Sequence, residues 1–359
     1  MPLAADLTAW LRLSLTAGLG GESFRKLLSA FGGPEPVLDA SRSALTRVVS
    51  GKIADAILDG EMFGDPAAVE AWLVDSNNHV VTLADVEYPQ ALLLTPDPPP
   101  LMYVKGRLDL LNQPAMAIVG SRNATAQGKL TAEAFATALS NAGLAIVSGL
   151  ALGIDAAAHR GGLTGVSSTI AIVGTGLDKV YPARNRDLAH AIADKGAIIS
   201  EFPLGTPPLA ANFPRRNRLI SGMTRGCLVV EAALSSGSLI TARLSNELGK
   251  DVFAIPGSIH STLSKGCHVL IKQGAKLVDD AADILSELRL PVPASGPSQP
   301  TAGAATHPLL AHMAYDPCDI DTLSGRAGLP VHEVSAALIQ LEMDGAVAAL
   351  PGGLWQRIS

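Results

Sequence analysis

The sequence predicts a doubly wound α/β fold with a mostly parallel sheet, preceded by a helical unit and followed by a small unit of two helices and a hairpin. Two observations predict this fold. Short Val- and Ile-rich runs recur in the middle of the chain, and helix-compatible segments separate them. A parallel strand that is covered on both faces shows a continuous apolar run rather than an alternating one, so these runs indicate buried parallel strands.

The first 84 residues predict the helical unit. Apolar residues recur at helical spacing in segments 6–16, 22–31, 42–49 and 53–58, and glycines break the chain between these segments. A glycine turn between short helices is also similar to a helix-hairpin-helix module, which binds DNA backbones. This segment carries 6 basic and 10 acidic side chains, so a helical bundle without that role is favoured.

The α/β unit is predicted over residues 85–290. A proline-rich stretch at 96–100 separates the helical unit from the first of the expected strands. Its expected strands are residues 115–119, 144–147, 169–173, 197–200, 227–230 and 252–255. Its expected helices are residues 125–141, 155–159, 185–195 and 238–248. Alternation of strands and helices in this order is typical of a Rossmann-like sheet with helices on both faces.

The end of the chain predicts a winged-helix domain over residues 309–359. Residues 291–308 are rich in proline and predict a linker. Two helices at 319–327 and 331–344 precede a hairpin at 346–358. Many such domains read DNA with the second helix, but segment 331–344 holds acidic residues and no Lys or Arg, so a protein contact is favoured over base reading.

Charge and cysteine content exclude several function classes. The formal net charge of −6 divides into −4 for residues 1–84, −4 for residues 301–359 and +2 for residues 85–300, so a polyanion is expected to bind the middle segment. The three cysteines are far apart, which disfavours a disulfide framework and a thiolate zinc site; we expect no metal and no cofactor. The N-terminus lacks an export signal and no long uncharged apolar run occurs, so we expect a cytoplasmic protein without a membrane partner.

A local cationic segment stands out in this acidic chain. Residues 202–230 contain four arginines and no Asp or Glu. The arginine fork is always charged and suits phosphate oxygens, which predicts a nucleotide or a nucleic acid backbone as ligand, although some of these arginines are expected to pair with carboxylates elsewhere. The Arg215, Arg216 and Arg218 segment is expected to be a loop at the rim of the sheet.

Ligands of parallel sheets bind at the carboxyl ends of the strands, so the segments after each apolar run matter most. The first is Gly-Ser-Arg-Asn-Ala-Thr at 120–125, with Thr125 as the expected cap of a helix whose amides would favour an anion. Gly and Ser also follow the later runs, at 148–153, 174–176 and 235–238. A row of such loops suits several phosphates in sequence, as a single nucleic acid strand presents them.

Asp155 and His159 are four residues apart on an expected helix. This spacing suits either an acid/base pair or a structural tie at the helix start. Because no third partner is evident, the structural interpretation is favoured.

Seven motifs in order resemble the DNA-processing protein A family, also called Smf. They are Gly-Ser-Arg, Ser-Gly-Leu-Ala-x-Gly-Ile-Asp-x-x-Ala-His, Gly-x-Gly-Leu-Asp-x-x-Tyr-Pro-x-x-Asn, Ser-Glu-x-Pro, Phe-Pro-x-Arg-Asn-Arg-x-Ile-Ser-Gly, Ser-Gly-Ser-Leu-x-Thr-Ala and Val-x-Ala-x-Pro-Gly, between residues 120 and 257. The resemblance implies binding of single-stranded DNA without strong sequence preference during natural transformation, protection of that strand, loading of the RecA recombinase onto it, and homodimerisation through the α/β domain.

The resemblance also implies a set of DNA-binding residues and no catalytic ones. They are Gly120, Ser121, Arg122, Ser148, Gly149, Arg215, Arg216, Asn217, Arg218, Ser221, Gly222, Ser238 and Lys265. His268 stands where the family usually has asparagine, so a contact from that residue is not carried over.

The alternative is an enzyme. Related Rossmann-like domains hydrolyse nucleoside monophosphates through a glutamate on a glycine-rich loop, but Thr241 occupies the corresponding position here. Glu231 could substitute only from the preceding strand end. A third possibility, a metabolite-sensing transcription regulator, is disfavoured by the acidic winged helix.

Overall fold

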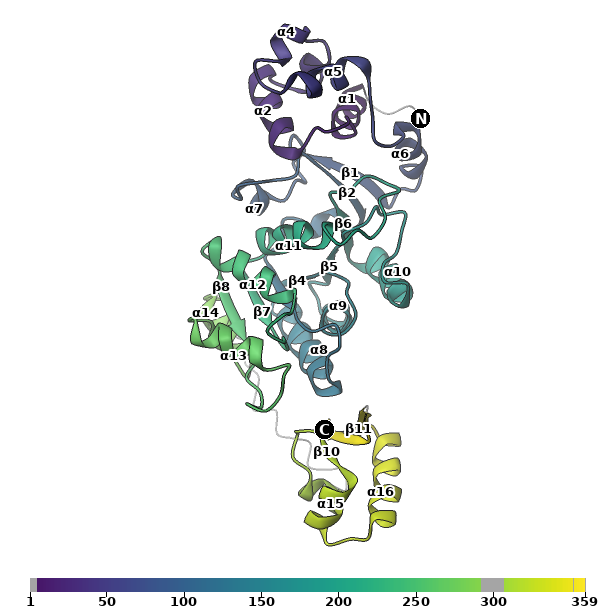
Figure 1. Cartoon of the computed structure of the whole chain (residues 1–359), viewed down its shortest axis with the longest axis vertical. Helices are drawn as coiled ribbons and strands as arrows, with labels where there is room; N and C mark the ends of the chain where they lie inside the picture. The colour runs from purple at the N-terminus through teal and green to yellow at the C-terminus, as the bar shows by residue number, and fades with distance from the viewer. Residues whose placement is uncertain (1–4, 292–306, 351, 359) are drawn as a thin grey trace.

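The computed structural model describes residues 5–291, 307–350 and 352–358. Figure 1 shows the N-terminal helices at one end, the sheet with its helices in the middle and the winged-helix unit at the other end. The predicted linker lies almost entirely outside the described residues.

The N-terminal unit is a bundle of short helices around Leu11, Leu13, Leu27 and Leu45, which are fully buried. The helices are α1 (Ala5–Ser14), α2 (Gly21–Phe31), α3 (Pro34–Leu38), α4 (Arg42–Leu45), α5 (Gly51–Asp59) and α6 (Pro66–Trp72). The sequence did not predict α3 and α6, which both begin with proline. Proline suits the first helical turn, where its missing N–H leaves no bond unmade.

The middle of the described chain forms a nine-stranded sheet in the order β1-β2-β6-β5-β4-β3-β7-β8-β9. Strands β3 to β9 run parallel to one another, which confirms the mostly parallel sheet. The strands are β1 (Asn78–Thr82), β2 (Leu101–Gly106), β3 (Ala115–Val119), β4 (Ala145–Ser148), β5 (Thr169–Ile172), β6 (Ala197–Ser200), β7 (Gly226–Val229), β8 (Asp251–Ala254) and β9 (Lys276–Leu277).

The edge strand β1 and its neighbour β2 place the start of the sheet before the predicted start of the α/β unit. β1 pairs antiparallel with β2, and β2 pairs antiparallel with β6, so the sheet begins at residue 78 rather than after residue 84. The prolines at 96–100 therefore lie within the α/β unit. The strand β1 is defined by its hydrogen bonds to β2. The sequence of these five residues alone does not reveal such bonds.

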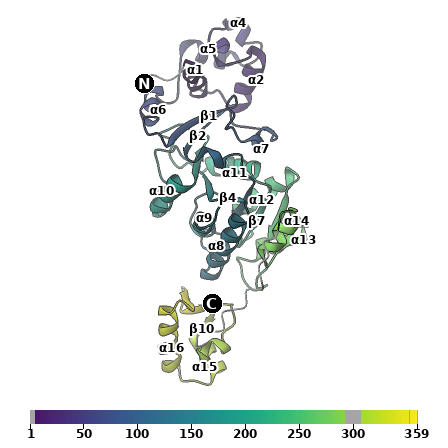
Figure 2. The ribbon, with the colours of Figure 1, turned by 180° about the vertical axis from the view of Figure 1, so that it is seen from behind.

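Helices cover both faces of the sheet, as Figures 1 and 2 show from opposite sides. One face packs against α7 (Gln90–Leu93), α11 (Asn212–Met223), α12 (Ser238–Glu247) and α13 (Lys265–Lys272). The other packs against α8 (Ala126–Asn141), α9 (Ile154–Thr164), α10 (Arg186–Lys195) and α14 (Ala281–Glu287). Buried, largely aliphatic side chains from alternate strand positions contribute to the two cores, as the doubly wound prediction requires.

The arginine segment is a helix and not a loop. Residues 212–223 form α11, with Pro214 in its first turn, where proline is tolerated. Leu219, Ile220 and Met223 are buried against the sheet. These apolar residues recur at helical spacing after the arginines. The prediction of a loop considered only the charge of the arginines.

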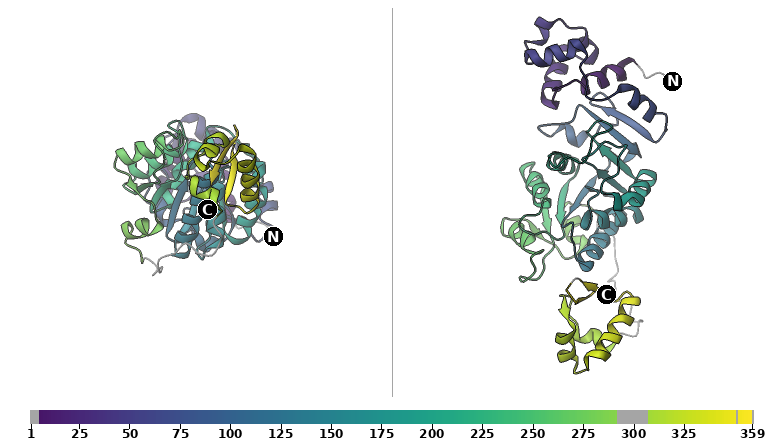
Figure 3. Two further views of the ribbon diagram at one scale, coloured as in Figure 1. Left: turned by 90° about the horizontal axis from the view of Figure 1, so that it is seen from below. Right: turned by 45° about the vertical axis from the view of Figure 1, so that its right-hand side comes forward.

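The C-terminal unit has the winged-helix architecture that the sequence predicts. It contains β10 (Cys318–Asp319), α15 (Ile320–Ala327), α16 (Val331–Met343), β11 (Val347–Leu350) and β12 (Leu354–Arg357), and its strands pair in the order β10-β12-β11. Asp319 caps α15 and Gly328 ends it in a left-handed conformation. Figure 3 shows this unit from below and in a turned view.

Candidate nucleic-acid interface

A cleft of about 670 Å³ lies at the carboxyl ends of β3, β4 and β7. The first half of α11 forms one wall, and the segment that leads into α12 forms the wall across from it. Six of the thirteen residues predicted to bind DNA line the cleft: Gly120, Ser121, Arg122, Arg216, Asn217 and Ser238. The strand-end segments therefore meet at one place, as the α/β topology requires.

Arg122 supplies an exposed positive charge at this cleft. Its guanidinium carbon lies 5.7 Å from the centre of the Phe213 ring. The Phe213 ring in turn lies 5.7 Å from that of Tyr181, which is exposed. A cation beside two aromatic rings can hold both the phosphate and the base of one nucleotide. The sequence prediction missed the pairing of Tyr181 with Phe213, although both stand in the quoted motifs.

The start of α8 differs from the sequence expectation of free amides. Thr125 caps the helix as predicted, accepting a hydrogen bond from the amide of Gly128 at 2.9 Å. However, Glu231 occupies the same helix end, because its carboxylate accepts from the amide of Thr125 at 3.0 Å and from its hydroxyl at 2.7 Å. The chain's own carboxylate thus takes the place at which a ligand anion was expected, and Arg122 remains as the exposed cation of this segment.

Arg216 is buried at the floor of the cleft. Its guanidinium donates to the carbonyl of Gly149 at 2.6 Å and to the carbonyl of Ile172. Burial lowers the pKa of Arg216 to about 10, with the nearby Asp155 acting in the opposite direction, so the side chain is charged at neutral pH. A Cβ atom at Gly149 would lie 2.2 Å from the guanidinium, so this glycine makes room for Arg216.

Asp155 and His159 form part of the same buried cluster, and their contacts are structural. The Asp155 carboxylate accepts from the amides of Gly149 at 3.1 Å and Ala151 at 3.4 Å. Burial raises the pKa of Asp155, and Arg216 opposes this shift.

His159 is fully buried and holds the turn after β4. Its Nε2 accepts from the amide of Leu150 at 3.3 Å, and Nδ1 lies 2.7 Å from the hydroxyl of Thr169. An imidazole that accepts at Nε2 is neutral with its proton on Nδ1, and burial lowers its pKa to about 3.

Arg215 and Arg218 lie on another side of α11. Both donate to one oxygen of the buried Glu201, the Arg215 pair being 3.1 Å long. Arg218 also pairs with Asp97 at 3.3 Å, and Asp97 pairs with Arg25 of α2 at 2.7 Å. Arg215 remains half exposed, whereas Arg218 is mostly covered.

The remaining predicted residues lie outside the cleft lining. Ser148 donates to the carbonyl of Ile118 at 2.7 Å, and Ser221 donates to that of Thr241 at 3.0 Å; both are fully buried. Gly222 packs against Leu92 of α7, and Lys265 begins α13 and donates to the carbonyl of Ile259.

The cleft does not present a glutamate at the position expected for nucleotide hydrolysis. Thr241 lies in the cleft wall, and Glu231 is bound to the start of α8. Within the described residues, no cluster of His, Cys, Asp or Glu suits a metal ion. No helix in the described ranges is long and apolar enough to span a membrane.

Comparison with known proteins supports the same interpretation of the α/β unit. The family model "DNA recombination-mediator protein A" matches residues 79–289, and the model "DprA winged helix domain" matches residues 293–353. The chain is 44% identical to Protein Smf of Escherichia coli over 292 residues, covering 79% of this chain and 78% of that protein. It is 35% identical to Protein Smf of Synechocystis, covering 97% of this chain and 98% of that protein.

Two solved structures are similar to this one. The X-ray structure of DNA processing protein A from Streptococcus pneumoniae matches with a TM-score of 0.70 and 38% identity, covering 80% of this chain and 99% of that one. A structure of DNA processing protein A from Helicobacter pylori, described for its single-stranded DNA binding mode, matches with a TM-score of 0.54 and 31% identity, covering 59% of this chain and 96% of that one. The chain therefore belongs to the DNA recombination-mediator protein A family, also known as DNA-processing protein A or Smf.

Proposed function

We propose that this protein binds single-stranded DNA in the cytoplasm during natural transformation, protects the strand and helps to load RecA recombinase onto it. The observation that carries the proposal is the exposed Arg122 beside the rings of Phe213 and Tyr181 in the cleft. Single-strand binders combine a basic groove with aromatic platforms on which bases stack.

The cleft suits an unpaired strand better than a duplex. A base can stack on Phe213 only when it is free of its own partner strand. The flanking units carry a charge of −4 each and would repel the dense phosphate charge of a duplex. Contacts through phosphates and ring faces carry little sequence information, which supports binding without strong sequence preference.

Similarity to the Helicobacter pylori protein, which is described for its single-stranded DNA binding mode, supports the ligand class. The family also suggests RecA as partner and a homodimer that forms through the α/β domain. The acidic end units suit contacts with proteins rather than with DNA. We further propose that the protein is not an enzyme, and steady release of free base from a nucleoside monophosphate would overturn this part.

The decisive experiment compares single-stranded and double-stranded DNA at two salt concentrations by fluorescence anisotropy. We expect the single strand to bind more tightly, and Arg122→Ala to weaken it roughly tenfold and to reduce the logarithmic salt slope by about 0.7, because one phosphate contact is lost. Arg160→Ala is the matched control, since Arg160 is a half-exposed arginine on α9 that pairs with Glu133. Equal binding of wild type and Arg122→Ala at both salt concentrations would place the DNA elsewhere.

A further inference from the structure

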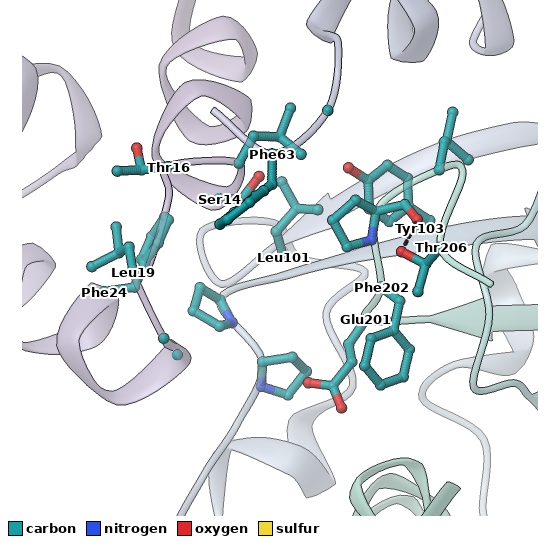
Figure 4. A pocket seen from close by; sticks show the side chains of 18 of the residues that line it. Ser14, Thr16, Leu19, Phe24, Phe63, Leu101, Tyr103, Glu201, Phe202 and Thr206 are labelled. Atoms are coloured by element: carbon teal, nitrogen blue, oxygen red, sulfur yellow. Dashed lines mark hydrogen bonds between the residues drawn. The ribbon is translucent and has the colours of Figure 1, made fainter. Parts of the chain in front are cut away.

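A second cavity of about 780 Å³ lies between the helical unit and the α/β unit. Figure 4 shows Leu19 and Phe24 on the helical side and Glu201 and Phe202 on the side of the sheet. Residues 201–203 of the motif Ser-Glu-x-Pro thus line this cavity. It has no part in the cleft described above.

The first turn of α11 connects the two cavities. Phe213 and Pro214 line the cleft, and the next residue, Arg215, lines the second cavity. The guanidinium carbon of Arg215 lies 5.4 Å from the centre of the Phe202 ring, and half of its side chain is exposed. Arg215 therefore presents an exposed cation between the cleft and the second cavity.

The walls of the second cavity suit a base and not a phosphate. Leu15, Leu19, Phe24 and Phe202 make them apolar. The charged side chains of the lining are Glu201 and Arg215, which pair with each other at 3.1 Å. A phosphate would lose its hydration among these apolar side chains, whereas a neutral planar base can enter.

Two buried polar atoms at this cavity have no hydrogen-bond partner among the described residues. One is Oε1 of Glu201, whose other oxygen takes both arginines and whose side chain is only 2% exposed. The other is the hydroxyl of Tyr103, a residue that is 1% exposed. Because buried polar groups are nearly always hydrogen-bonded, these two atoms indicate a missing partner.

We propose that the second cavity receives one base of the bound strand, and that Glu201 Oε1 accepts a hydrogen bond from an exocyclic amino group of that base. Cytosine, adenine and guanine carry such a group, and thymine presents carbonyl oxygens instead. The subsite rests on the proposed function. It would lower the affinity for thymine at one nucleotide position, whereas the rest of the strand is bound through its backbone and base faces.

The test measures affinities of the full chain for oligo-dC and oligo-dT of about 20 nucleotides, two pyrimidine strands that differ at this group. Wild type should bind oligo-dC about fivefold more tightly, a factor typical of one hydrogen bond. Glu201→Gln should invert the ratio. The arginines only donate, so they keep the amide oxygen, and the amide NH2 then faces the cavity, where it suits a carbonyl of thymine.

Two further variants make the result decisive. Leu19→Trp fills the cavity without touching Glu201 and should bring the ratio close to one, with folding checked by circular dichroism. Glu133→Gln, at an exposed ion pair on α8, should keep the wild-type ratio. Equal affinity of wild type for both strands would overturn the base subsite alone, whereas failure to bind either strand would overturn the proposed function.

Discussion

Arg216 shows how one residue type takes different roles within four positions. Arg215 is half exposed, Arg216 is buried on two carbonyl oxygens, and Arg218 is mostly covered by carboxylates. The sequence predicts that this segment is cationic, but it does not say which arginine points inward. That choice depends on the space opposite Gly149 and on the carbonyl of Ile172, which belong to other strands.

His159 predicts a pH dependence of stability. Its folded pKa of about 3 lies below the unfolded value of about 6.5, so between these values the unfolded chain binds a proton that the folded chain does not. The free energy of unfolding should therefore fall by about 2 kcal/mol between pH 7.5 and 5.0. Urea denaturation across this range measures it.

The control for this effect is another histidine. His159→Gln should remove most of the slope, whereas the same change at the exposed His190 on α10 should leave it. A wild-type curve that stays flat down to pH 5.0 would contradict a neutral buried His159.

At the scale of elements, the strands were predicted best. The apolar run 115–119 coincides with β3, and the other five predicted runs shift by one residue or less at each end. Burial on both faces leaves a strong local pattern at these positions. The helix α11 and the strands β1 and β2 were missed, because tertiary contacts rather than local pattern decide them.

The prediction for the cleft was correspondingly partial. The meeting of the strand ends at one rim follows from topology alone, and six of the predicted residues line it. The carboxylate of Glu231 at the start of α8 could not be foreseen, because the two segments are more than a hundred residues apart.

The start of α8 is open to a direct test. Thr125→Val removes the cap on Gly128 and the hydroxyl's bond to Glu231, and we expect a loss of about 1 to 2 kcal/mol in the free energy of unfolding. Thr46→Val is the control, since its exposed hydroxyl makes one bond of 3.3 Å within its own turn. Equal urea midpoints for the two variants would show that the cap contributes little.

At the scale of the whole molecule, the cleft is lined by residues of the α/β unit and not by residues of the two acidic end units. The residues that line the cleft fall between 119 and 241, far from the winged helix in sequence. The helix α16, the second helix of the winged-helix unit, carries Glu333 and Glu342 and exposes Ile339 and Met343. Such a surface suits contact with a protein better than contact with the edge of a base.

Removal of residues 300–359 should therefore leave the affinity for single-stranded DNA within about twofold, since no phosphate contact is lost. Anisotropy with the same oligonucleotide measures both chains. A loss of tenfold or more would move part of the strand path onto the winged helix.

The pairing of β1 with β2 has a consequence for any shortened form of this protein. A chain that began at residue 85 would lack β1, and Met102 and Val104 of β2 would lie on a strand with one row of unpaired amides and carbonyls. Unprotected edges of this kind recruit strands from other molecules and promote aggregation. Truncation that spares residues 78–82 should keep the isolated α/β unit in solution.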